Sequence, residues 1–318
     1  MGKINWGVLG FARIAKNEGI PAILEAESAD FYALASRNEE KLKEADELFH
    51  PEKLYLSYEE LLKDEDVNAV YIPLPNALHK EWVIKAMEAG KHVLCEKPLA
   101  LTEEEVREMV EVSKKHNVIL MEAFMYRYSE RTRKIEEILE SGLLGEVRHV
   151  DSTFRFFLDR EGTIKMKREL GGGALYDVGC YPVNFATMVM KEEPVKISSA
   201  AKMENGVDVQ VSVLMEYEDG KTASLHAGFN AFGKNYSEII GTKGRLEIPD
   251  SFLDNEGIIT LYTKEGKEEL FVPECHRYTL EFEDFSKAIL EKRAPLLTLE
   301  ESLANSRILD RIFKSLLN

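Results

Sequence analysis

Cysteine is scarce in this sequence, and its three cysteines, Cys95, Cys180 and Cys275, lie far apart. No Cys-x-x-Cys pair occurs, and no cysteines and histidines have the spacing of zinc ligands, so we expect neither a disulfide framework nor a metal site. Scattered free thiols are typical of proteins in a reducing compartment, which favours the cytoplasm.

Long apolar runs are also missing. No stretch approaches the ~20 consecutive apolar residues that a membrane helix needs. The first residues, MGKINWGVLGF, lack the apolar core of a signal peptide and the serine or threonine of a myristoylation site. We therefore expect a cytoplasmic protein that does not associate with a membrane.

Basic residues are outnumbered, because 41 lysines and arginines stand against 57 aspartates and glutamates, which leaves a net charge of -16. This surplus of negative charge repels nucleic acids and anionic lipids, so we expect neither as a partner. Glutamine occurs only at Gln210, while glutamate and lysine abound. That bias is typical of proteins from heat-adapted organisms.

The length of 318 residues predicts two domains, since one domain usually holds ~150 residues. Short β-rich runs first alternate with helical patterns, which is typical of a parallel sheet with crossover helices. Helices are expected at 38–49, 77–89 and 102–115, the last with a capping box formed by Thr102 and Glu105. The expected strands cover residues 4–9, 31–36, 54–56, 68–74, 91–96 and 118–123.

The pattern changes beyond residue 125. A helix at 130–140 ends at Gly142, a long strand follows at 145–157, and another helix is expected near 181–190. Alternating segments at intervals of ~10 residues then predict an antiparallel sheet. These segments cover residues 195–203, 207–217, 221–229, 236–242, 244–249, 257–263 and 267–273, and helices at 279–291 and 299–317 follow.

The predicted fold class is therefore α/β, with two domains of different construction. Residues 1–123 are expected to form a dinucleotide-binding Rossmann domain around a doubly wound parallel sheet. Residues 124–318 are expected to form an α+β domain with a large, mainly antiparallel sheet.

The stretch GVLGFARIA follows the first expected strand and opens a helix. Its pattern Gly10-x-Ala12-x-x-Ala15 resembles a dinucleotide-binding turn, in which Gly10 permits the tight turn and Ala15 close helix packing. Ala12 adds a methyl group where glycine lets the backbone approach a pyrophosphate. An ordinary strand-to-helix turn is the alternative. The cofactor-binding residues expected here are Gly10, Phe11, Ala12, Arg13 and Ile14.

The end of the second strand bears on the choice of cofactor. An NAD site usually has an acidic residue here, which holds the ribose hydroxyls. This strand instead ends in Ser36 and Arg37, with Lys41 one helical turn later. A hydroxyl and two cations suit a 2′-phosphate, so we favour NADP over NAD, although a solvated helix start could carry the same residues.

Two further strands, in YIPLPNALH and HVLCEKP, end at the carboxyl edge of the sheet, where such sheets bind ligands. Lys97 directly follows a buried strand, so its stem is held and partly desolvated. Its ammonium can orient a hydroxyl, lower the pKa of a neighbour or transfer a proton itself. Pro98 allows a cis bond to Lys97, and we predict one. The residues expected to converge here are Pro73, Leu74, Asn76, His79, Glu96 and Lys97.

A second cluster lies in GGGALYDVGCYPVN. Gly171, Gly172 and Gly173 allow a bend close to a ligand, and Asp177 and Tyr181 share one face if the segment is helical. Pro182 is unfavourable inside a helix, so the helix could begin near it and the shared face stays provisional. The plain structural alternative is a core tyrosine and a capping aspartate.

These motifs together resemble one family. Over essentially its full length the chain resembles the glucose-fructose oxidoreductase/inositol dehydrogenase family (Gfo/Idh/MocA), through GVLGFARIA, PLPNALH, AGKHVLCEKPLAL, EAFMYRY, GLLGEVRHV and GGGALYDVGCYPVN. The most specific parts are Glu-Lys-Pro and Gly-Gly-Gly-x-x-x-Asp-x-Gly-x-Tyr. Because the last position of this motif is a tyrosine, the chain is most similar to the NADP-linked D-xylose dehydrogenases and dihydrodiol dehydrogenases.

The resemblance implies a dehydrogenase or reductase that transfers hydride between NADP, with NAD as the alternative, and a secondary alcohol of a sugar, cyclic polyol or vicinal diol. It implies Tyr181 as the proton acceptor and Lys97 as the cation that lowers its pKa and orients the substrate oxygen. Free tyrosine ionises near pH ~10, so an adjacent ammonium makes it useful near neutral pH. Lys97 as the direct base stays open.

Further roles follow from the resemblance. Asp177 is expected to hold substrate hydroxyls and Lys97, while Glu96 anchors the loop or the cofactor ribose. His79, Arg127 and Phe156 are expected to line the pocket, Arg127 as a cofactor-binding and Phe156 as a substrate-binding residue. The family usually forms homodimers or homotetramers, which we expect here through the C-terminal sheet.

Two other functions would use the same scaffold. A non-catalytic NAD(P)-sensing regulatory protein could lose Lys97, Asp177 and Tyr181 freely, and their presence argues against it. A glycosidase that uses NAD transiently needs an NAD site, and Ser36 with Arg37 points away from one.

Overall fold

The computed structural model describes residues 2–160, 162–253 and 255–316, and its contacts divide the chain into two compact units. Unit 1 comprises Met1–Met125 and His276–Leu303, and unit 2 comprises Tyr126–Cys275 and Ala304–Asn318. The sequence placed the boundary at 123/124 and assigned everything beyond it to the second domain. The structure corrects this for residues 276–303, which return to unit 1.

Unit 1 contains a six-stranded sheet with the order β3-β2-β1-β4-β5-β6, in which every neighbouring pair is parallel. This is the strand order of a Rossmann fold, as predicted. The strands are β1 (Ile4–Leu9), β2 (Ala29–Ala35), β3 (Lys53–Tyr55), β4 (Ala69–Ile72), β5 (His92–Glu96) and β6 (Leu120–Ala123).

Some helices of unit 1 begin directly after a capping side chain. The side chains of Asn38 and Thr102 accept hydrogen bonds from the Lys41 and Glu105 backbone amides. Each of the two is therefore the N-cap of its helix, and the helix begins one residue later than predicted. The Glu105 carboxylate accepts from the Leu101 amide, one residue before the expected cap. The helical segments are η1 (Ala15–Gly19), α1 (Ile20–Glu25), α2 (Glu39–Phe49), α3 (Tyr58–Lys63), η2 (Asn76–Leu78), α4 (His79–Glu88), α5 (Glu103–His116) and α8 (Arg277–Glu291).

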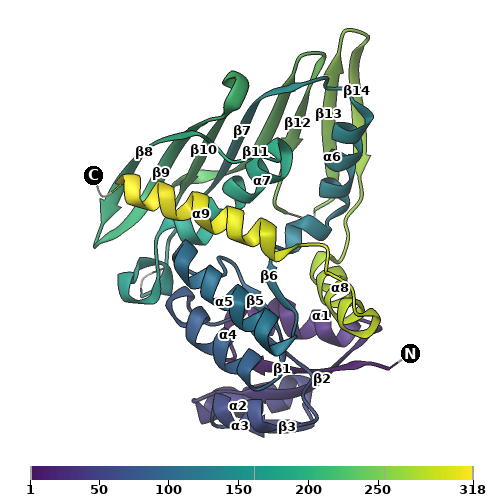
Figure 1. Ribbon diagram of the computed structural model, residues 1–318, viewed down its shortest axis with the longest axis vertical. Helices are drawn as coiled ribbons and strands as arrows, with labels where there is room; N and C mark the ends of the chain where they lie inside the picture. Colours follow the sequence, from purple (N-terminus) through teal and green to yellow (C-terminus); the bar gives the residue numbers. More distant parts are fainter. Residues whose placement is uncertain (1, 161, 254, 317–318) are drawn as a thin grey trace. The chain divides into compact units, whose positions relative to one another are not determined.

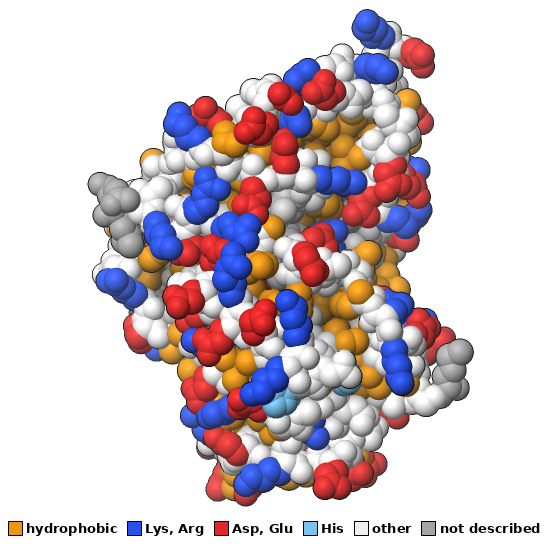
Figure 2. Space-filling view, viewed as in Figure 1, with side chains coloured by type: hydrophobic (Ala, Val, Ile, Leu, Met, Phe, Trp, Pro, Cys, Tyr) orange, Lys and Arg blue, Asp and Glu red, His pale blue; other side chains and the backbone are white. Residues whose placement is uncertain are grey.

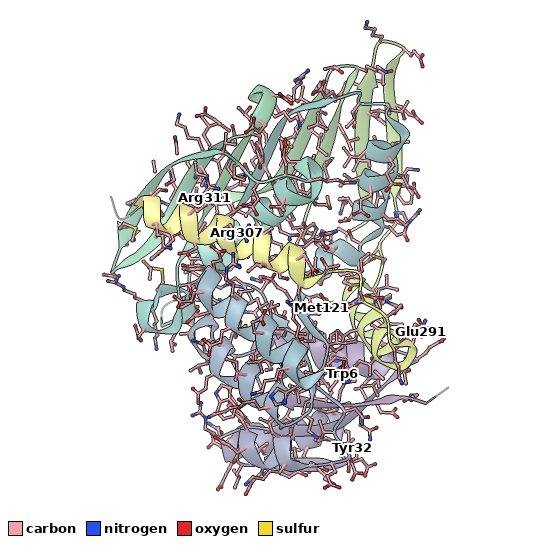
Figure 3. All side chains as sticks on the ribbon, in the orientation of Figure 1. Trp6, Tyr32, Met121, Glu291, Arg307 and Arg311 are labelled. Carbon is pink, nitrogen blue, oxygen red and sulfur yellow. The ribbon has the colours of Figure 1, made fainter. Side chains whose placement is uncertain are left out.

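Helix α8 belongs to unit 1 because it covers Trp6 of β1 (Figure 3). The Trp6 ring lies 4.9 Å from Phe282 and 5.4 Å from Phe285, and its indole N–H donates to Ser286 Oγ at 3.1 Å. Trp6 and Phe285 are both fully buried. The two partners stand almost at opposite ends of the chain, so no local sequence pattern signals their contact.

Unit 2 contains an eight-stranded sheet with the order β14-β13-β12-β11-β7-β10-β9-β8. Its pairs are antiparallel except for β7 and β10, which run parallel, so the expected mainly antiparallel sheet is confirmed. The strands are β7 (Val147–Phe157), β8 (Lys196–Glu204), β9 (Val207–Glu216), β10 (Thr222–Gly228), β11 (Asn230–Gly241), β12 (Gly244–Pro249), β13 (Gly257–Thr263) and β14 (Gly266–Val272).

One face of this sheet is covered by helices (Figure 1). In β10 the buried residues Ala223 and Leu225 alternate with half-exposed Ser224 and His226, so the opposite face is more open and more polar. The helical segments of unit 2 are η3 (Met125–Tyr128, which begins at the unit boundary), α6 (Glu130–Ser141), η4 (Ile164–Met166), η5 (Arg168–Leu170), η6 (Leu175–Gly179), α7 (Cys180–Met190) and η7 (Glu218–Gly220).

The division between the units falls within α9 (Leu299–Leu316). Its later turns carry Arg307 and Arg311 (Figure 3). Arg307 forms an ion pair with Glu193, and Arg311 donates to the Pro194 carbonyl at 2.7 Å. These contacts fix α9 to the segment that leads into β8.

The charges of the chain are spread over its surface. Figure 2 shows acidic and basic side chains interspersed on the visible face, so the net negative charge is not gathered there in one field. Within the described ranges, no helix combines the length and the apolar character that crossing a membrane would require.

Candidate active site

Gly10 forms the turn at the end of β1, as the sequence predicted. Its φ of +98° lies in the left-handed region, and its amide donates to the Ala35 carbonyl at 2.8 Å. A Cβ at this position would lie 2.8 Å from Leu74 Cδ2. Only glycine therefore allows the turn to pack on the loop after β4.

The helix after this turn begins with a π-helical turn, η1, rather than a plain α-helix. The Ala12 carbonyl accepts from the Lys16 amide at 3.0 Å, so the free amides of the helix start lie near Arg13 and Ile14. Arg13 is exposed and Ala15 is fully buried, whereas the Phe11 side chain packs into the core against Phe49. Phe11 can therefore offer a ligand little more than its backbone.

The three residues predicted for the 2′-phosphate differ in availability. Ser36 is 4% exposed, and its hydroxyl accepts from the Asn38 amide at 3.3 Å. Arg37 and Lys41 are exposed, and among the described residues neither has an ion pair with a carboxylate. The Arg37 guanidinium lies 5.1 Å from the centre of the Tyr58 ring, which holds it near the end of β2.

His79 connects the two loops that carry the predicted ligand residues. Its Nε2 lies 2.8 Å from the Leu74 carbonyl and its Nδ1 lies 2.9 Å from the Pro98 carbonyl. Burial lowers the pKa of the imidazole, against the two carbonyls, which raise it. The ring is fully buried, so it holds the loops together instead of lining a pocket as expected.

The Lys97 loop is held from two sides within unit 1. The Lys97–Pro98 bond is cis, as predicted, and Lys97 is half-buried. Before it, Glu96 Oε1 accepts from the Tyr71 hydroxyl at 2.6 Å, which anchors the loop to β4. After it, the Leu99 amide donates to Glu122 Oε1 at 2.9 Å. Of the other residues predicted for this site, Pro73 is buried and Asn76 is half-buried.

Glu122 was not identified from the sequence. It is 2% exposed, and its Oε2 has no hydrogen-bond partner among the described residues. Burial raises the pKa of its carboxyl to about 7, while Ser302, the Leu99 amide and the Lys97 ammonium oppose the rise. The signal was a glutamate inside the otherwise apolar run VILMEA.

A second buried carboxyl faces Glu96. Glu281 of α8 is 1% exposed, and its Oε1 has no hydrogen-bond partner within the described part of the chain. Burial, and then the charge of Glu96, raise the pKa of Glu281 well above its usual value, and Arg277 lowers it. The same two causes raise the pKa of the Tyr71 phenol. The environment of Glu96 therefore favours a protonated Glu281.

In unit 2, Asp177 and Tyr181 stand on one continuous helical segment. Asp177 lies in the π-helical turn η6, Tyr181 lies in the first turn of α7, and Gly179 and Cys180 between them have helical angles. Pro182 falls near the start of α7, where proline is tolerated, as the sequence analysis suggested. The structure thus supplies the helical geometry that was provisional.

The surroundings of the two residues differ. Tyr181 is 4% exposed, and its ring packs 5.9 Å from Tyr126, 5.3 Å from Phe154 and 5.5 Å from Phe252. Asp177 forms an ion pair with Lys165. Lys165 had not been identified from the sequence.

Asp208 holds the start of this helical segment and was also missed. Its Oδ2 accepts from the Leu175 amide at 2.7 Å, and burial raises its pKa to about 6. Gly173 has a φ of +121°, and a Cβ there would overlap with Asp208 Oδ1. In the sequence Asp208 is one residue of an alternating strand, with no mark of a cap.

The two residues placed by resemblance alone lie in unit 2. Arg127 is 8% exposed, and its guanidinium lies 3.5 Å from Glu136 of α6. Phe156 is half-buried, with its ring 5.2 Å from Phe229 and 5.6 Å from the Lys165 ammonium. Phe156 therefore belongs to the same cluster as Asp177.

Both units correspond to known family models. Residues 4–124 match an oxidoreductase family with an NAD-binding Rossmann fold, and residues 132–247 match the GFO/IDH/MocA C-terminal domain. The chain belongs to the GFO/IDH/MocA oxidoreductase family. This confirms the resemblance drawn from the motifs and explains why the predicted fold class was correct.

Members of this family with named activities are similar over nearly the whole chain. The D-xylose 1-dehydrogenase (NADP(+)) 2 of Haloferax volcanii is 38% identical over 317 residues, 98% of this chain and 96% of that protein. The trans-1,2-dihydrobenzene-1,2-diol dehydrogenase of Xenopus laevis is 33% identical, over 98% and 97%.

A solved structure has the same fold. A 3-ketoreductase from Actinomadura kijaniata, in complex with NADP and TDP-benzene, has a TM-score of 0.93 at 29% identity and covers 99% of this chain and 98% of that chain. Further structures of that reductase carry a lysine or a tyrosine substitution.

Proposed function

We propose that this member of the GFO/IDH/MocA family is an NADP-dependent oxidoreductase that transfers hydride between the nicotinamide and a secondary alcohol of a sugar, cyclic polyol or vicinal diol. The observation that carries the proposal is that the chain keeps Lys97, Asp177 and Tyr181, the groups that the chemistry requires, on the scaffold of an oxidoreductase family. The named activities of the D-xylose and dihydrodiol dehydrogenases support the same substrate classes.

The residues of unit 1 fit NADP. Gly10 and the free amides of the η1 start suit a pyrophosphate, and the exposed cations Arg37 and Lys41 suit a 2′-phosphate at the end of β2. The residues that end the strand, Ser36 and Arg37, do not include the carboxylate that usually holds the ribose hydroxyls of NAD. NAD lacks the phosphate, so it would leave these two cations unused.

The catalytic roles follow from the proton balance. Oxidising an alcohol to a carbonyl releases a hydride from carbon and a proton from oxygen, and the bound nicotinamide supplies the hydride acceptor. Tyr181 accepts the hydroxyl proton, and the Lys97 ammonium orients the substrate oxygen and favours the ionised phenol. Asp177 accepts hydrogen bonds from substrate hydroxyls. Reduction runs through the same groups in reverse.

The Actinomadura kijaniata reductase supports these assignments. Its structures include variants with a lysine replaced by alanine or glutamate and a tyrosine replaced by phenylalanine. Those two residues are separated along that chain by the same number of positions as Lys97 and Tyr181 are here.

A screen of NADP and NAD against pentoses, hexoses, inositols and diols, followed by NADPH absorbance, tests the proposal. We expect turnover with NADP on at least one sugar or polyol, and slower turnover with NAD. NADPH binding without turnover on any substrate would contradict the proposal and favour a sensor. Net hydrolysis of a glycoside without a change in absorbance would favour a glycosidase.

Tyr181→Phe tests the proton acceptor. We expect kcat to fall about 100-fold or more, because the acid–base group is lost, while the Kd for NADPH stays unchanged. Tyr262→Phe, which removes a hydroxyl that donates to Glu247 in the sheet, is the matched control and should keep full turnover. Retained turnover in Tyr181→Phe would move the proton chemistry to Lys97.

We further propose a cytoplasmic homodimer or homotetramer formed through the open face of the eight-stranded sheet. Leu214, Ile258 and Phe271 on that face are 42%, 46% and 64% exposed, which favours burial against another copy. Light scattering coupled to size exclusion measures the assembly. A monomer at micromolar concentration would contradict this part.

A further inference from the structure

Lys165 of unit 2 is held close to Asp177, although no sequence motif indicated a role for it. It lies on the turn η4, between β7 and η6, and its ammonium forms an ion pair with Asp177. The ammonium also lies 5.6 Å from the centre of the Phe156 ring and 6.0 Å from that of Phe229. Carboxylate, ammonium and aromatic ring therefore stand side by side.

The glycines before the helix are what bring this turn to Asp177. The Gly173 amide donates to the Lys165 carbonyl at 2.9 Å, and the Gly172 amide donates to the Lys167 carbonyl at 3.0 Å. A Cβ on Gly172 would lie 2.5 Å from the Lys165 carbonyl oxygen. The backbone of the Lys165 turn can approach the helix start only because position 172 has no side chain.

Stability alone does not account for this arrangement. The Lys165 and Asp177 side chains are 26% and 19% exposed, and ion pairs that water reaches contribute little to folding. Partial exposure does leave both groups accessible to a ligand. The pair presents a hydrogen-bond donor and an acceptor next to each other, which is the pattern that two neighbouring hydroxyl groups match.

Phe156 adds an apolar surface to this pattern. Its half-buried ring packs 5.2 Å from the ring of Phe229, which is 3% exposed and holds it in place. The C–H face of a sugar or cyclitol ring packs well on an aromatic side chain, while its hydroxyls point to polar groups.

We propose that Lys165 and Asp177 form a subsite for two neighbouring hydroxyls of the substrate, beside Phe156 as a packing surface. Asp177 accepts from one hydroxyl and Lys165 donates to the oxygen of the other. This rests on the proposed function and narrows it, because the substrate needs two hydroxyls besides the reacting one. The substrate is then a sugar or cyclic polyol, and a simple vicinal diol is excluded as the preferred one.

The test uses Lys165→Met in the full-length enzyme, with the sugar that the wild type turns over best and its two analogues lacking either neighbouring hydroxyl. For D-xylose oxidised at C1 these are the 2-deoxy and 3-deoxy pentoses. We expect the KM for the complete sugar to rise about 10-fold or more, with kcat within about threefold, because a charge-assisted hydrogen bond is lost. For the analogue that lacks the partner hydroxyl, the substitution should change KM less than about twofold, since no bond remains to be lost.

Two further variants keep the result interpretable. Lys167→Met changes an exposed lysine on the same loop and should leave both constants unchanged. Lys165→Arg retains the charge and should restore part of the affinity. NADPH binding and the melting temperature should match the wild type in each case.

The outcomes separate this inference from the proposed function. An unchanged KM in Lys165→Met, or an equal rise for the complete sugar and both analogues, overturns the subsite. So does a wild-type preference for diols that carry no further hydroxyl. Each of these leaves the oxidoreductase intact, whereas absence of NADP-linked turnover in the wild type removes the proposed function itself.

Discussion

At the residue scale, Glu122 should make the free energy of unfolding depend on pH. Its pKa is raised from 4.5 to about 7 by burial, so the folded chain prefers the protonated carboxyl. The resulting stabilisation is fully present below pH 4.5 and is lost as the pH rises through about 7.

We therefore expect the free energy of unfolding to fall between pH 5 and pH 8, by about 3 kcal/mol at most from this group. Glu122→Gln keeps an oxygen for the Leu99 amide and cannot ionise, so its unfolding free energy should depend less on pH. Urea denaturation at the two pH values measures this. Asp208→Asn, at another buried carboxyl with a raised pKa, is the control that shows how much of the slope belongs to that second group. An identical slope in Glu122→Gln and the wild type would contradict the assignment.

Single residues show where sequence reasoning succeeded. Gly10 was predicted because a turn between strand and helix requires a left-handed residue, and its partners lie close in the chain. The cis bond before Pro98 followed from proline chemistry. Glu122 and Lys165 were missed because their significance depends on burial and on partners brought together by the fold.

His79 was identified from the sequence, but its contacts in the fold could not be predicted. A histidine after a strand end resembles a ligand-binding residue in the sequence. The structure places its ring between two backbone carbonyls, at 2.8 and 2.9 Å, where it supports the loops that were thought to share its role. Nothing in the local sequence pattern distinguishes a histidine that binds a ligand from one that supports loops.

At the element scale, the helical segments that follow Gly10 and Gly173 begin with a π-helical turn, η1 and η6 respectively. Such turns are rare and are frequent at functional sites. In η1 the wide turn brings Gly19 against Tyr71, where a Cβ would lie 2.5 Å from the ring. Tyr71 in turn holds Glu96 next to Lys97.

Gly19→Ala should therefore displace the Tyr71 ring and disturb Glu96. We expect a loss of about 1–3 kcal/mol in the free energy of unfolding, from overpacking, together with a lower kcat. Gly233→Ala is the matched control, since its Cβ would make an ordinary contact at 3.6 Å. A variant with wild-type stability and turnover would show that η1 and the Lys97 loop are not linked through Tyr71.

Element boundaries were predictable to within a few residues because caps and apolar periodicity are local. Asn38 and Thr102 were included in helices that begin one residue later, since a cap belongs to the pattern but not to the helix. The parallel pairing of β7 with β10 could not be predicted, because strand spacing indicates hairpins and says nothing of which distant strands meet.

At the scale of the whole molecule, the division of the chain was the main error of the sequence analysis. Residues 276–303 follow the unit 2 sheet in sequence and nevertheless complete unit 1. Domain length and composition could locate the first boundary near residue 125, but the return depends on the contact between Trp6 and the α8 phenylalanines.

Phe285→Ala tests how far unit 1 depends on this return. Phe285 is fully buried, so its truncation should cost about 3–5 kcal/mol of unfolding free energy. Phe232→Ala removes a ring that is 95% exposed and should change the unfolding free energy by less than about 0.5 kcal/mol. Guanidinium denaturation compares the two. Equal stabilities would mean that α8 adds little to unit 1.

The return of α8 also has a consequence for biogenesis. During translation the first 125 residues leave the ribosome while the residues that cover Trp6 have not yet been made, and the whole unit 2 sheet emerges in between. Synthesis at ~5–20 residues per second leaves that indole uncovered for many seconds. A circular permutant that begins at residue 276 would supply the cover first, and its nascent chain should resist aggregation and proteolysis better than the natural order does.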